Sequence, residues 1–160
     1  MIFSRVLLTL SLLIALSCSS TADGDKEVVR EKRSIEKTEA SNTINFYKNI
    51  SLEEAKSLAK KENKHVFIDY YADWCAPCKV MEKNVFTEEA VYSFFNERFI
   101  NVKMDVEDRS VGSEAAAIHN ISAMPTLVLI DPEKDVIMKE RGYRDADGLL
   151  KAVNSALSNL

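Results

Sequence analysis

The sequence predicts a single α/β domain in which a central mixed sheet is flanked by helices. The chain has 160 residues, enough for one domain of ordinary size and too few for two. Hydrophobic residues make up 46% of it and charged residues 29%, as expected of a globular protein with a core. Strand-like segments alternate with helical ones, which favours parallel pairing, and the last two strand-like segments follow each other directly, which adds an antiparallel pair.

The predicted elements follow one another closely, so we expect the domain to occupy residues 42–160. A capping box from Ser51 to Glu54 begins a first helix, and Thr87 is the expected N-cap of a later one. Runs of β-branched and aromatic residues or strict alternation predict the strands, and apolar residues at helical spacing predict the helices. The expected strands are 65–71, 99–106, 126–130 and an edge strand at 136–141, and further helices follow residue 75, cover 110–120 and carry the apolar residues of 149–157.

Residues 1–17 have the features of an export signal. Arg5 supplies a positive charge and precedes an apolar run from Val6 to Leu16. As a helix, this run would be about 16 Å long, roughly half the hydrocarbon thickness of a bilayer. We therefore expect a cleaved signal peptide rather than a membrane span.

The position of cleavage has two alternatives. Small residues before Cys18 and at Ala22 suit ordinary signal peptidase, whereas Leu16-Ser17-Cys18 also resembles the box at which a bacterial lipoprotein is lipidated. We expect lipidation of Cys18, because it would account for an unpaired thiol in an exported chain. The alternative is that Cys18 is removed or has no role.

Residues 18–41 are expected to form a flexible charged tether. Ten of the fifteen residues from 25 to 39 are charged, so this stretch cannot bury enough apolar surface to offset its ordering entropy. A coil of roughly 20 residues reaches on the order of 25 Å, which would hold a domain away from a membrane surface. A segment without any role is the alternative.

Two cysteines separated by two residues carry the chemistry. Cys75 follows the predicted strand 65–71 and stands where a helix should begin. Unpaired N–H groups and the positive dipole end of a helix stabilise a thiolate, so Cys75 is the expected nucleophile. Cys78 is close enough to resolve a mixed disulfide, and Pro77 suits the first helical turn, where its missing N–H removes no hydrogen bond.

Zinc binding and a permanent structural disulfide are the alternatives for this pair. A structural zinc site needs two more ligands at suitable spacing, but His65 and His119 are 54 residues apart on different predicted elements. We expect one to be a strand-edge residue and the other a helix-surface residue. A disulfide across so short a loop stabilises a fold very little. A redox couple without metal or cofactor is therefore favoured.

The segment from Phe67 to Lys79, FIDYYADWCAPCK, resembles the active-site segment of the thioredoxin superfamily. Together with the residues up to Phe86, it is most similar to the C-terminal periplasmic domain of the transmembrane thiol:disulfide interchange protein and to its small exported relatives. The resemblance covers residues 45–158, and Met-Pro-Thr at 124–126 is a second specific match. It implies the thioredoxin fold for this domain.

The resemblance also implies roles for four further side chains. Asp69 matches a buried carboxylate that relays a proton for the resolving cysteine, and a carboxylate in a doubly buried strand needs a task or a partner. Lys103 matches a lysine beside that carboxylate, Glu82 matches a second acidic residue, and Trp74 matches an aromatic residue beside the dithiol. Structural alternatives stay open for all four: a salt bridge for Asp69, solvated positions for Glu82 and Lys103, and packing alone for Trp74.

Pro125 matches the cis-proline that faces the dithiol in this superfamily. A cis bond leaves the backbone of Met124 free to pair with an extended substrate peptide, and Thr126 completes the motif. The resemblance therefore implies that Met124, Pro125 and Thr126 bind substrate and that the proline keeps metal ions from the thiols. An ordinary trans proline in a turn is the alternative.

These observations predict an exported thiol:disulfide oxidoreductase, periplasmic or otherwise extracytoplasmic and anchored to the membrane as a lipoprotein. Reduction is favoured over oxidation because Ala76 and Pro77 provide no histidine to stabilise the thiolate. The expected partners are disulfide-containing exported proteins, or apocytochrome thiols before haem attachment, and a membrane electron donor. The formal charge of −4 argues against nucleic acid as a partner.

Two other functions are less favoured by the sequence. A peptide-binding or chaperone-like module with the thioredoxin fold would not need the cysteine pair, the buried carboxylate and the proline together. A eukaryotic secretory-pathway isomerase would carry a C-terminal retention signal, which is not seen in this sequence.

Overall fold

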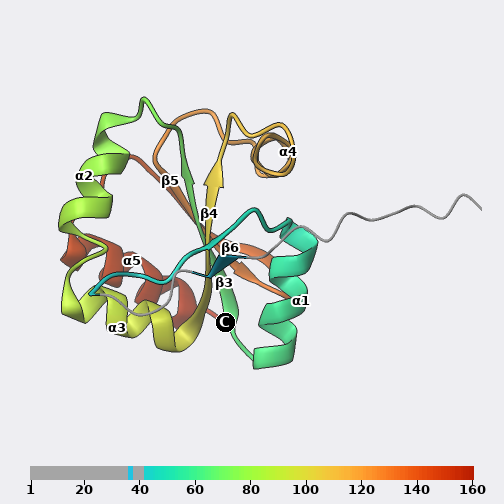
Figure 1. The fold of residues 1–160 in the computed structure, drawn as a ribbon. Coiled ribbons are helices and arrows are strands. Elements are labelled where there is room, and N and C mark those ends of the chain that lie inside the picture. Colours follow the sequence, from blue (N-terminus) through green and yellow to red (C-terminus); the bar gives the residue numbers. More distant parts are fainter. Residues whose placement is uncertain (1–35, 38–41) are drawn as a thin grey trace, which may run out of the picture. The chain divides into compact units, whose positions relative to one another are not determined.

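The computed structural model describes residues 36–37 and 42–160, so the expected signal peptide, Cys18 and the expected tether other than residues 36–37 lie outside the described residues. At 36–37 the expectation of a flexible tether is wrong, because these two residues form a strand that pairs with residues 47–48. The predicted α/β class is confirmed: a mixed sheet of six strands has the order β1-β2-β4-β3-β5-β6 and is flanked by helices (Figure 1). Within the described part of the chain, no helix is both long enough and apolar enough to cross a membrane.

The sheet is parallel in its middle and antiparallel at both sides. β3 pairs in parallel with β4 and antiparallel with β5, and β5 pairs antiparallel with β6 at the edge. β2 pairs in parallel with β4, and β1 pairs antiparallel with β2. The strands are β1 (Glu36–Lys37), β2 (Tyr47–Lys48), β3 (His65–Tyr71), β4 (Phe99–Asp105), β5 (Thr126–Asp131) and β6 (Asp135–Arg141). The four longer strands match the predicted ones, whereas two-residue strands carry no periodic pattern and were not predicted.

Helices cover both faces of the sheet. They are α1 (Leu52–Glu62), α2 (Ala76–Asn84), α3 (Glu89–Arg98), α4 (Gly112–Ile118) and α5 (Ala146–Ser158). One core cluster packs α2, α3 and α5 against the sheet, and a second packs α1 and α4 against its other face (Figure 1). Successive strand residues point to opposite faces. Because Phe67 belongs to the first cluster and Tyr70 to the second, Asp69 lies on the face that α2 covers.

The starts of the helices test the capping predictions. Ser51 and Glu54 form the predicted capping box of α1. The prediction of Thr87 as an N-cap is wrong: α3 has Glu88 at that position with no side-chain cap, and the Thr87 hydroxyl instead donates to the carbonyl oxygen of Lys83 at 2.7 Å. The Thr87 hydroxyl thus binds a carbonyl group in the last turn of α2, and the local sequence pattern does not indicate this contact.

The helix predicted over 110–120 is shorter in the structure, and one of the two histidines is not where we expected it. α4 ends at Ile118, because Asn120 takes a left-handed backbone conformation with φ 51°. The expectation of a helix-surface position for His119 is wrong, since its side chain is buried and contacts Tyr70. His65 begins β3 and is half-buried, as expected of a strand-edge residue.

Candidate active site

A disulfide between Cys75 and Cys78 lies where the turn after β3 becomes α2. Cys75 is the N-cap of the helix, and its Sγ accepts a hydrogen bond from the backbone N–H of Cys78 at 3.2 Å. Pro77 lies in the first turn, where an N–H would have no acceptor within the helix. The helix therefore begins at the predicted residue, and its free N–H end faces the sulfur of Cys75.

Both cysteine side chains are almost fully buried, with exposed fractions of 2% and 3%. They form a small cluster with Ala72, and Tyr71, Val106 and Met124 pack against it. The positive end of the helix dipole stabilises negative charge on the Cys75 sulfur when the disulfide is reduced. The arrangement can therefore hold a nucleophilic thiolate and a second thiol next to it.

The peptide bond between Met124 and Pro125 is cis, as the resemblance implied. The carbonyl oxygen of Pro125 accepts a hydrogen bond from the N–H of Gly142 at 2.8 Å. The hydroxyl of Thr126 donates to the carbonyl oxygen of Ala123 at 2.7 Å. These bonds hold the backbone around the cis bond in place while the Met124 side chain packs against the cysteine cluster.

Asp69, Lys103 and Glu82 come from three elements and form one charged group. Asp69 in β3 and Lys103 in β4 are direct neighbours in the parallel register. The Nζ atom of Lys103 lies 3.6 Å from Oδ2 of Asp69 and 3.1 Å from Oε2 of Glu82, which is on α2. Asp69 and Lys103 are buried, whereas Glu82 is exposed. This group joins two core strands to the helix that begins at the disulfide.

Burial dominates the acidity of Asp69. It raises the pKa of the carboxyl group to about 6, the Lys103 ammonium opposes this rise, and the Glu82 carboxylate adds to it. Neither carboxylate oxygen of Asp69 has a hydrogen-bond partner among the described residues. A carboxyl group with such a pKa can accept and release a proton near neutral pH.

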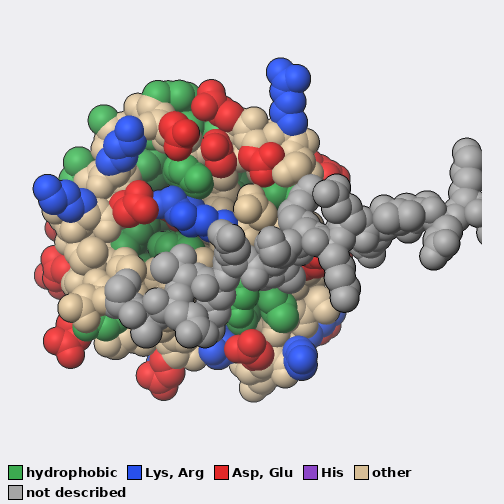
Figure 2. Space-filling model, in the orientation of Figure 1, with side chains coloured by type: hydrophobic (Ala, Val, Ile, Leu, Met, Phe, Trp, Pro, Cys, Tyr) green, Lys and Arg blue, Asp and Glu red, His purple; other side chains and the backbone are tan. Residues whose placement is uncertain are grey.

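A cavity of about 260 Å³ opens beside Lys103. The Nζ atom of Lys103 lies 4.7 Å from the centre of the Tyr71 ring, a cation–π contact at the cavity wall. Burial, followed by the nearby carboxylates, raises the pKa of Tyr71 to about 12. Figure 2 shows a hollow on this face with a basic side chain inside it and acidic side chains near its border. The cavity is lined by Lys48, Asn49, Tyr71, Lys103, Met104, Asp105, Asp108 and Val111.

Because Lys103 lines the cavity and also faces Asp69, the cavity brings solvent close to an otherwise buried ion pair. The disulfide cysteines do not line it. The cavity therefore reaches the Lys103 side of the ion pair, and neither Asp69 nor the two sulfurs line it.

Trp74 precedes the disulfide and is exposed over 65% of its surface. Its indole Nε1–H donates to Oε1 of Glu107 at 3.0 Å. Glu107 lies in the turn after β4, where the carboxylate of Asp105 accepts its backbone N–H at 3.0 Å. The indole is thus tied to the neighbouring loop and is not part of the cysteine cluster.

The structure brings most of the expected site residues together. Cys75, Cys78 and Met124 share one cluster, and Asp69, Lys103 and Glu82 share another, whereas Cys18 lies outside the described residues. Sequence reasoning missed Glu107 and Gly142, whose contacts with Trp74 and Pro125 depend on how two loops meet. No local pattern marks either residue.

Comparisons with known proteins agree on one family for this chain. The sequence matches the Thioredoxin-like family over residues 46–132, which is more than half of the chain. The thiol:disulfide interchange protein DsbD of Actinobacillus pleuropneumoniae serotype 5b is 30% identical over 120 residues, covering 72% of this chain and 20% of DsbD. The chain thus spans about one fifth of the length of this relative.

Solved structures give the same fold. A Bacteroides thetaiotaomicron protein proposed as a disulphide-isomerase is 34% identical, with a TM-score of 0.66, and the match covers 76% of this chain and 99% of that one. The DsbH oxidoreductase is 21% identical with a TM-score of 0.60, over 79% of this chain and 94% of its own, a likeness that concerns the fold alone.

Proposed function

This chain belongs to the thioredoxin-like family, with relatives that are thiol:disulfide oxidoreductases, and we propose that it is an exported reductase of protein disulfides. One observation carries the proposal. The Cys75–Cys78 disulfide lies at a helix N-terminus, and Met124, whose bond to Pro125 is cis, packs against it. The sequence adds the predicted export signal and the dipeptide between the cysteines, which has no histidine.

The reaction starts from the reduced dithiol. The Cys75 thiolate attacks one sulfur of a partner disulfide, forms a mixed disulfide and releases the first partner sulfur as a thiolate. Cys78 then loses its proton, and its thiolate attacks Sγ of Cys75, which releases the second partner sulfur. Two electrons pass to the partner, and the Cys75–Cys78 disulfide is left. A dithiol of a membrane protein would return two electrons by the reverse exchange.

We assign the proton of the resolving step to Asp69. Its raised pKa and its position on the face under α2 suit a group that takes a proton from Cys78 and returns it to solvent. Lys103 and Glu82 would adjust the proton affinity of Asp69, and the cavity beside Lys103 would admit water to the pair. Exposed Trp74 would contact a partner bound at the disulfide, and Pro77 begins the first helical turn.

Substrate binding is assigned to Met124, Pro125 and Thr126. Met124 packs against the disulfide, and the cis bond that follows it would leave its backbone groups available to an extended partner segment, which could pair with them as an added strand. The proposed partners are disulfide-containing exported proteins. Lipidation of Cys18 would keep the domain at the membrane, near its electron donor, and mass analysis of the N-terminal peptide would test this.

The test is reduction of insulin disulfides by the purified protein with a dithiol as electron source. We expect turnover by the wild type and by a Cys18→Ser variant, and none by Cys75→Ser. Equal rates for Cys75→Ser and the wild type would defeat the redox proposal and favour a peptide-binding module. A reduction potential above about −180 mV, the value of protein disulfide isomerase, would defeat the reductase direction.

The identity of the physiological partner follows from a trapping experiment. A Cys78→Ser variant cannot resolve the mixed disulfide, so its partner stays bound to Cys75. Expression of this variant in the native host should capture an exported protein with a reducible disulfide. A Cys75→Ser/Cys78→Ser variant is the matched control and should capture none.

Disulfide isomerisation is a second candidate because of the similarity to the proposed isomerase of Bacteroides thetaiotaomicron. An isomerase acts with Cys75 reduced but needs no net electron transfer, because the second thiolate of the partner displaces Cys75. Recovery of activity from scrambled ribonuclease distinguishes the two. Recovery by Cys78→Ser as fast as by the wild type would favour isomerisation, since Cys78 is needed only for net reduction.

A further inference from the structure

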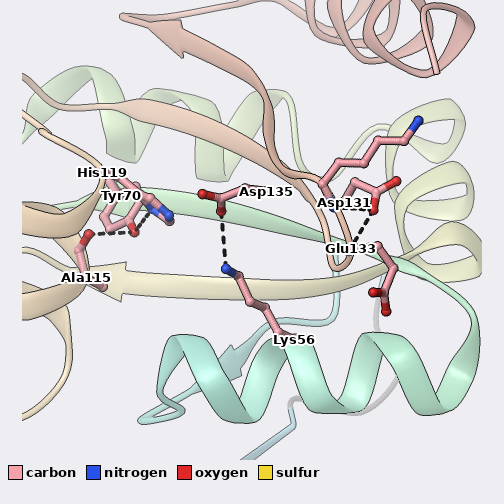
Figure 3. Close-up of polar contacts among 8 residues, drawn as sticks. Lys56, Tyr70, Ala115, His119, Asp131, Glu133 and Asp135 are labelled. Carbon is pink, nitrogen blue, oxygen red and sulfur yellow. Dashed lines mark hydrogen bonds and ion pairs between the residues drawn. The ribbon is translucent and has the colours of Figure 1, made fainter.

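The two ends of the segment that carries the cis bond are both attached to Tyr70. This segment, residues 119–126, is called the cis-proline loop below. The Tyr70 hydroxyl lies 2.6 Å from Nδ1 of His119, the first residue of the loop (Figure 3). The backbone of Tyr70 pairs in antiparallel register with Thr126, the last residue of the loop. A single residue, five positions before Cys75, therefore spans the loop.

The contact at His119 is well defined. Tyr70 is fully buried and His119 is 6% exposed. The Tyr70 hydroxyl donates to the carbonyl oxygen of Ala115 in α4 at 3.2 Å, which leaves its oxygen free to accept the Nδ1–H of His119 (Figure 3). A hydroxyl has one hydrogen, so this arrangement satisfies both contacts.

Other contacts at the start of the loop make His119 a junction of three elements. It caps α4, its side chain contacts β3, and its carbonyl oxygen accepts a hydrogen bond from Nζ of Lys139 in β6 at 2.9 Å. Burial lowers the pKa of His119, with Asp135 opposing this effect and the Lys56 and Lys139 ammonium groups adding to it. This shift favours the neutral imidazole, in which Nδ1–H can donate to the Tyr70 oxygen.

A short stretch of chain links His119 to the residue that packs against the disulfide. After the left-handed Asn120, only Ile121 to Ala123 separate the junction from Met124, which packs against the cysteine cluster. Ile121 itself is held by its N–H, which donates to the carbonyl oxygen of Ala116 at 2.8 Å. A shift at His119 would thus move Met124, which packs against the disulfide.

We propose that Tyr70 and His119 are positioning residues for substrate binding: their buried hydrogen bond sets the place of the cis-proline loop relative to Cys75. The proposal rests on the function proposed above. It predicts that losing the bond impairs reactions that need the loop, and spares those that need only the thiols. Protein disulfides belong to the first class and a small aromatic disulfide, 5,5′-dithiobis(2-nitrobenzoate), belongs to the second.

The test compares the two substrates in variants that remove or keep the bond. Tyr70→Phe and His119→Leu should lower kcat/KM for insulin by roughly fivefold to tenfold, the loss expected for one buried hydrogen bond, with less than about a twofold change for the small disulfide. His119→Asn can place a donor near the Nδ1 position and should recover most of the insulin activity. Tyr92→Phe removes a hydroxyl from α3 and is the matched control.

Three results would overturn the proposal. They are unchanged insulin activity in a folded Tyr70→Phe variant, an equal loss for both substrates, and failure of His119→Asn to exceed His119→Leu. Amide hydrogen exchange of residues 120–124 gives a readout that needs no redox activity and should be faster in Tyr70→Phe. If the wild type reduces neither substrate, the proposed function fails, while faster exchange in this variant would still support the positioning.

Discussion

The ammonium group of Lys103 lies 3.6 Å from the carboxylate of Asp69, and both side chains are buried on the face of the sheet that α2 covers. At this distance the two groups attract each other, yet the attraction does not offset the loss of hydration, since the pKa of Asp69 is still raised to about 6. The raised pKa lets Asp69 exchange a proton near neutral pH, and keeping its carboxylate charged and buried there lowers the stability of the fold. This has consequences that can be measured.

Replacing Asp69 by asparagine should stabilise the protein at neutral pH. The carboxyl pKa is about 6 in the folded state against 3.8 for the ordinary group, so between these values the folded state binds more protons. Stability must then fall as the pH rises from about 4 to above 6, by at most ~3 kcal/mol. We expect Asp69→Asn to exceed the wild type by ~1–3 kcal/mol at pH 7.5 and to match it near pH 4.

Urea unfolding at the two pH values measures this difference. Glu97→Gln, which removes an exposed carboxylate from α3, is the control and should show no pH-dependent gain. A destabilised Asp69→Asn protein at pH 7.5 would mean that the ion pair stabilises the fold.

Glu82→Gln and Lys103→Met should shift the pH profile of insulin reduction in opposite directions. The negative charge of Glu82 raises the pKa of Asp69, and the positive charge of Lys103 lowers it. The profile should therefore move to lower pH in Glu82→Gln and to higher pH in Lys103→Met. Lys83→Gln changes an exposed charge on the same helix and should leave the midpoint in place. Shifts of the same sign in both variants would contradict Asp69 as the titrating group.

The hydrogen bond from Trp74 to Glu107 should restrict the indole next to the disulfide. Because the chain has one tryptophan, its fluorescence anisotropy reports this site directly. Glu107→Leu removes the acceptor and should lower the anisotropy, whereas Glu107→Gln keeps an amide oxygen and should preserve it. An exposed hydrogen bond is worth ~1 kcal/mol, so insulin reduction should change less than about fivefold. Identical anisotropy in both variants would show that the contact does not order the indole.

Gly112 should not tolerate even alanine. A Cβ atom at this position would lie 1.7 Å from the carbonyl oxygen of Asp105, at the end of β4. Gly112→Ala must therefore push α4 away from the sheet, and we expect a loss of ~2–4 kcal/mol in urea unfolding. Ser113→Ala, at the exposed neighbouring position, should lie within about 0.5 kcal/mol of the wild type. A Gly112→Ala protein of full stability would show that the approach of α4 is not required.

The main strands and the cysteine site could be predicted because their signals are local. Residues 65–71 and 126–130 are rich in apolar and β-branched side chains, and the capping box of α1 lies within four residues. The prediction for Thr87 is wrong because a hydroxyl can either accept from the first N–H groups of a helix or donate to a carbonyl oxygen at the end of the preceding one. In the folded chain it donates to Lys83 at the end of α2. His119 was misjudged because its burial depends on Tyr70, which is 49 residues earlier.

The sequence by itself determined the chemistry of this protein: two thiols three positions apart at the start of a helix, where covalent spacing and the helix dipole act within one turn. Only the tertiary structure decided which side chains surround them. Lys103 meets Asp69 and Glu82 because β3 and β4 pair in one particular register beneath α2. Tyr70 reaches His119 because α4 packs on the opposite face. Such contacts join residues 21 to 49 positions apart, a separation over which sequence periodicity carries no information.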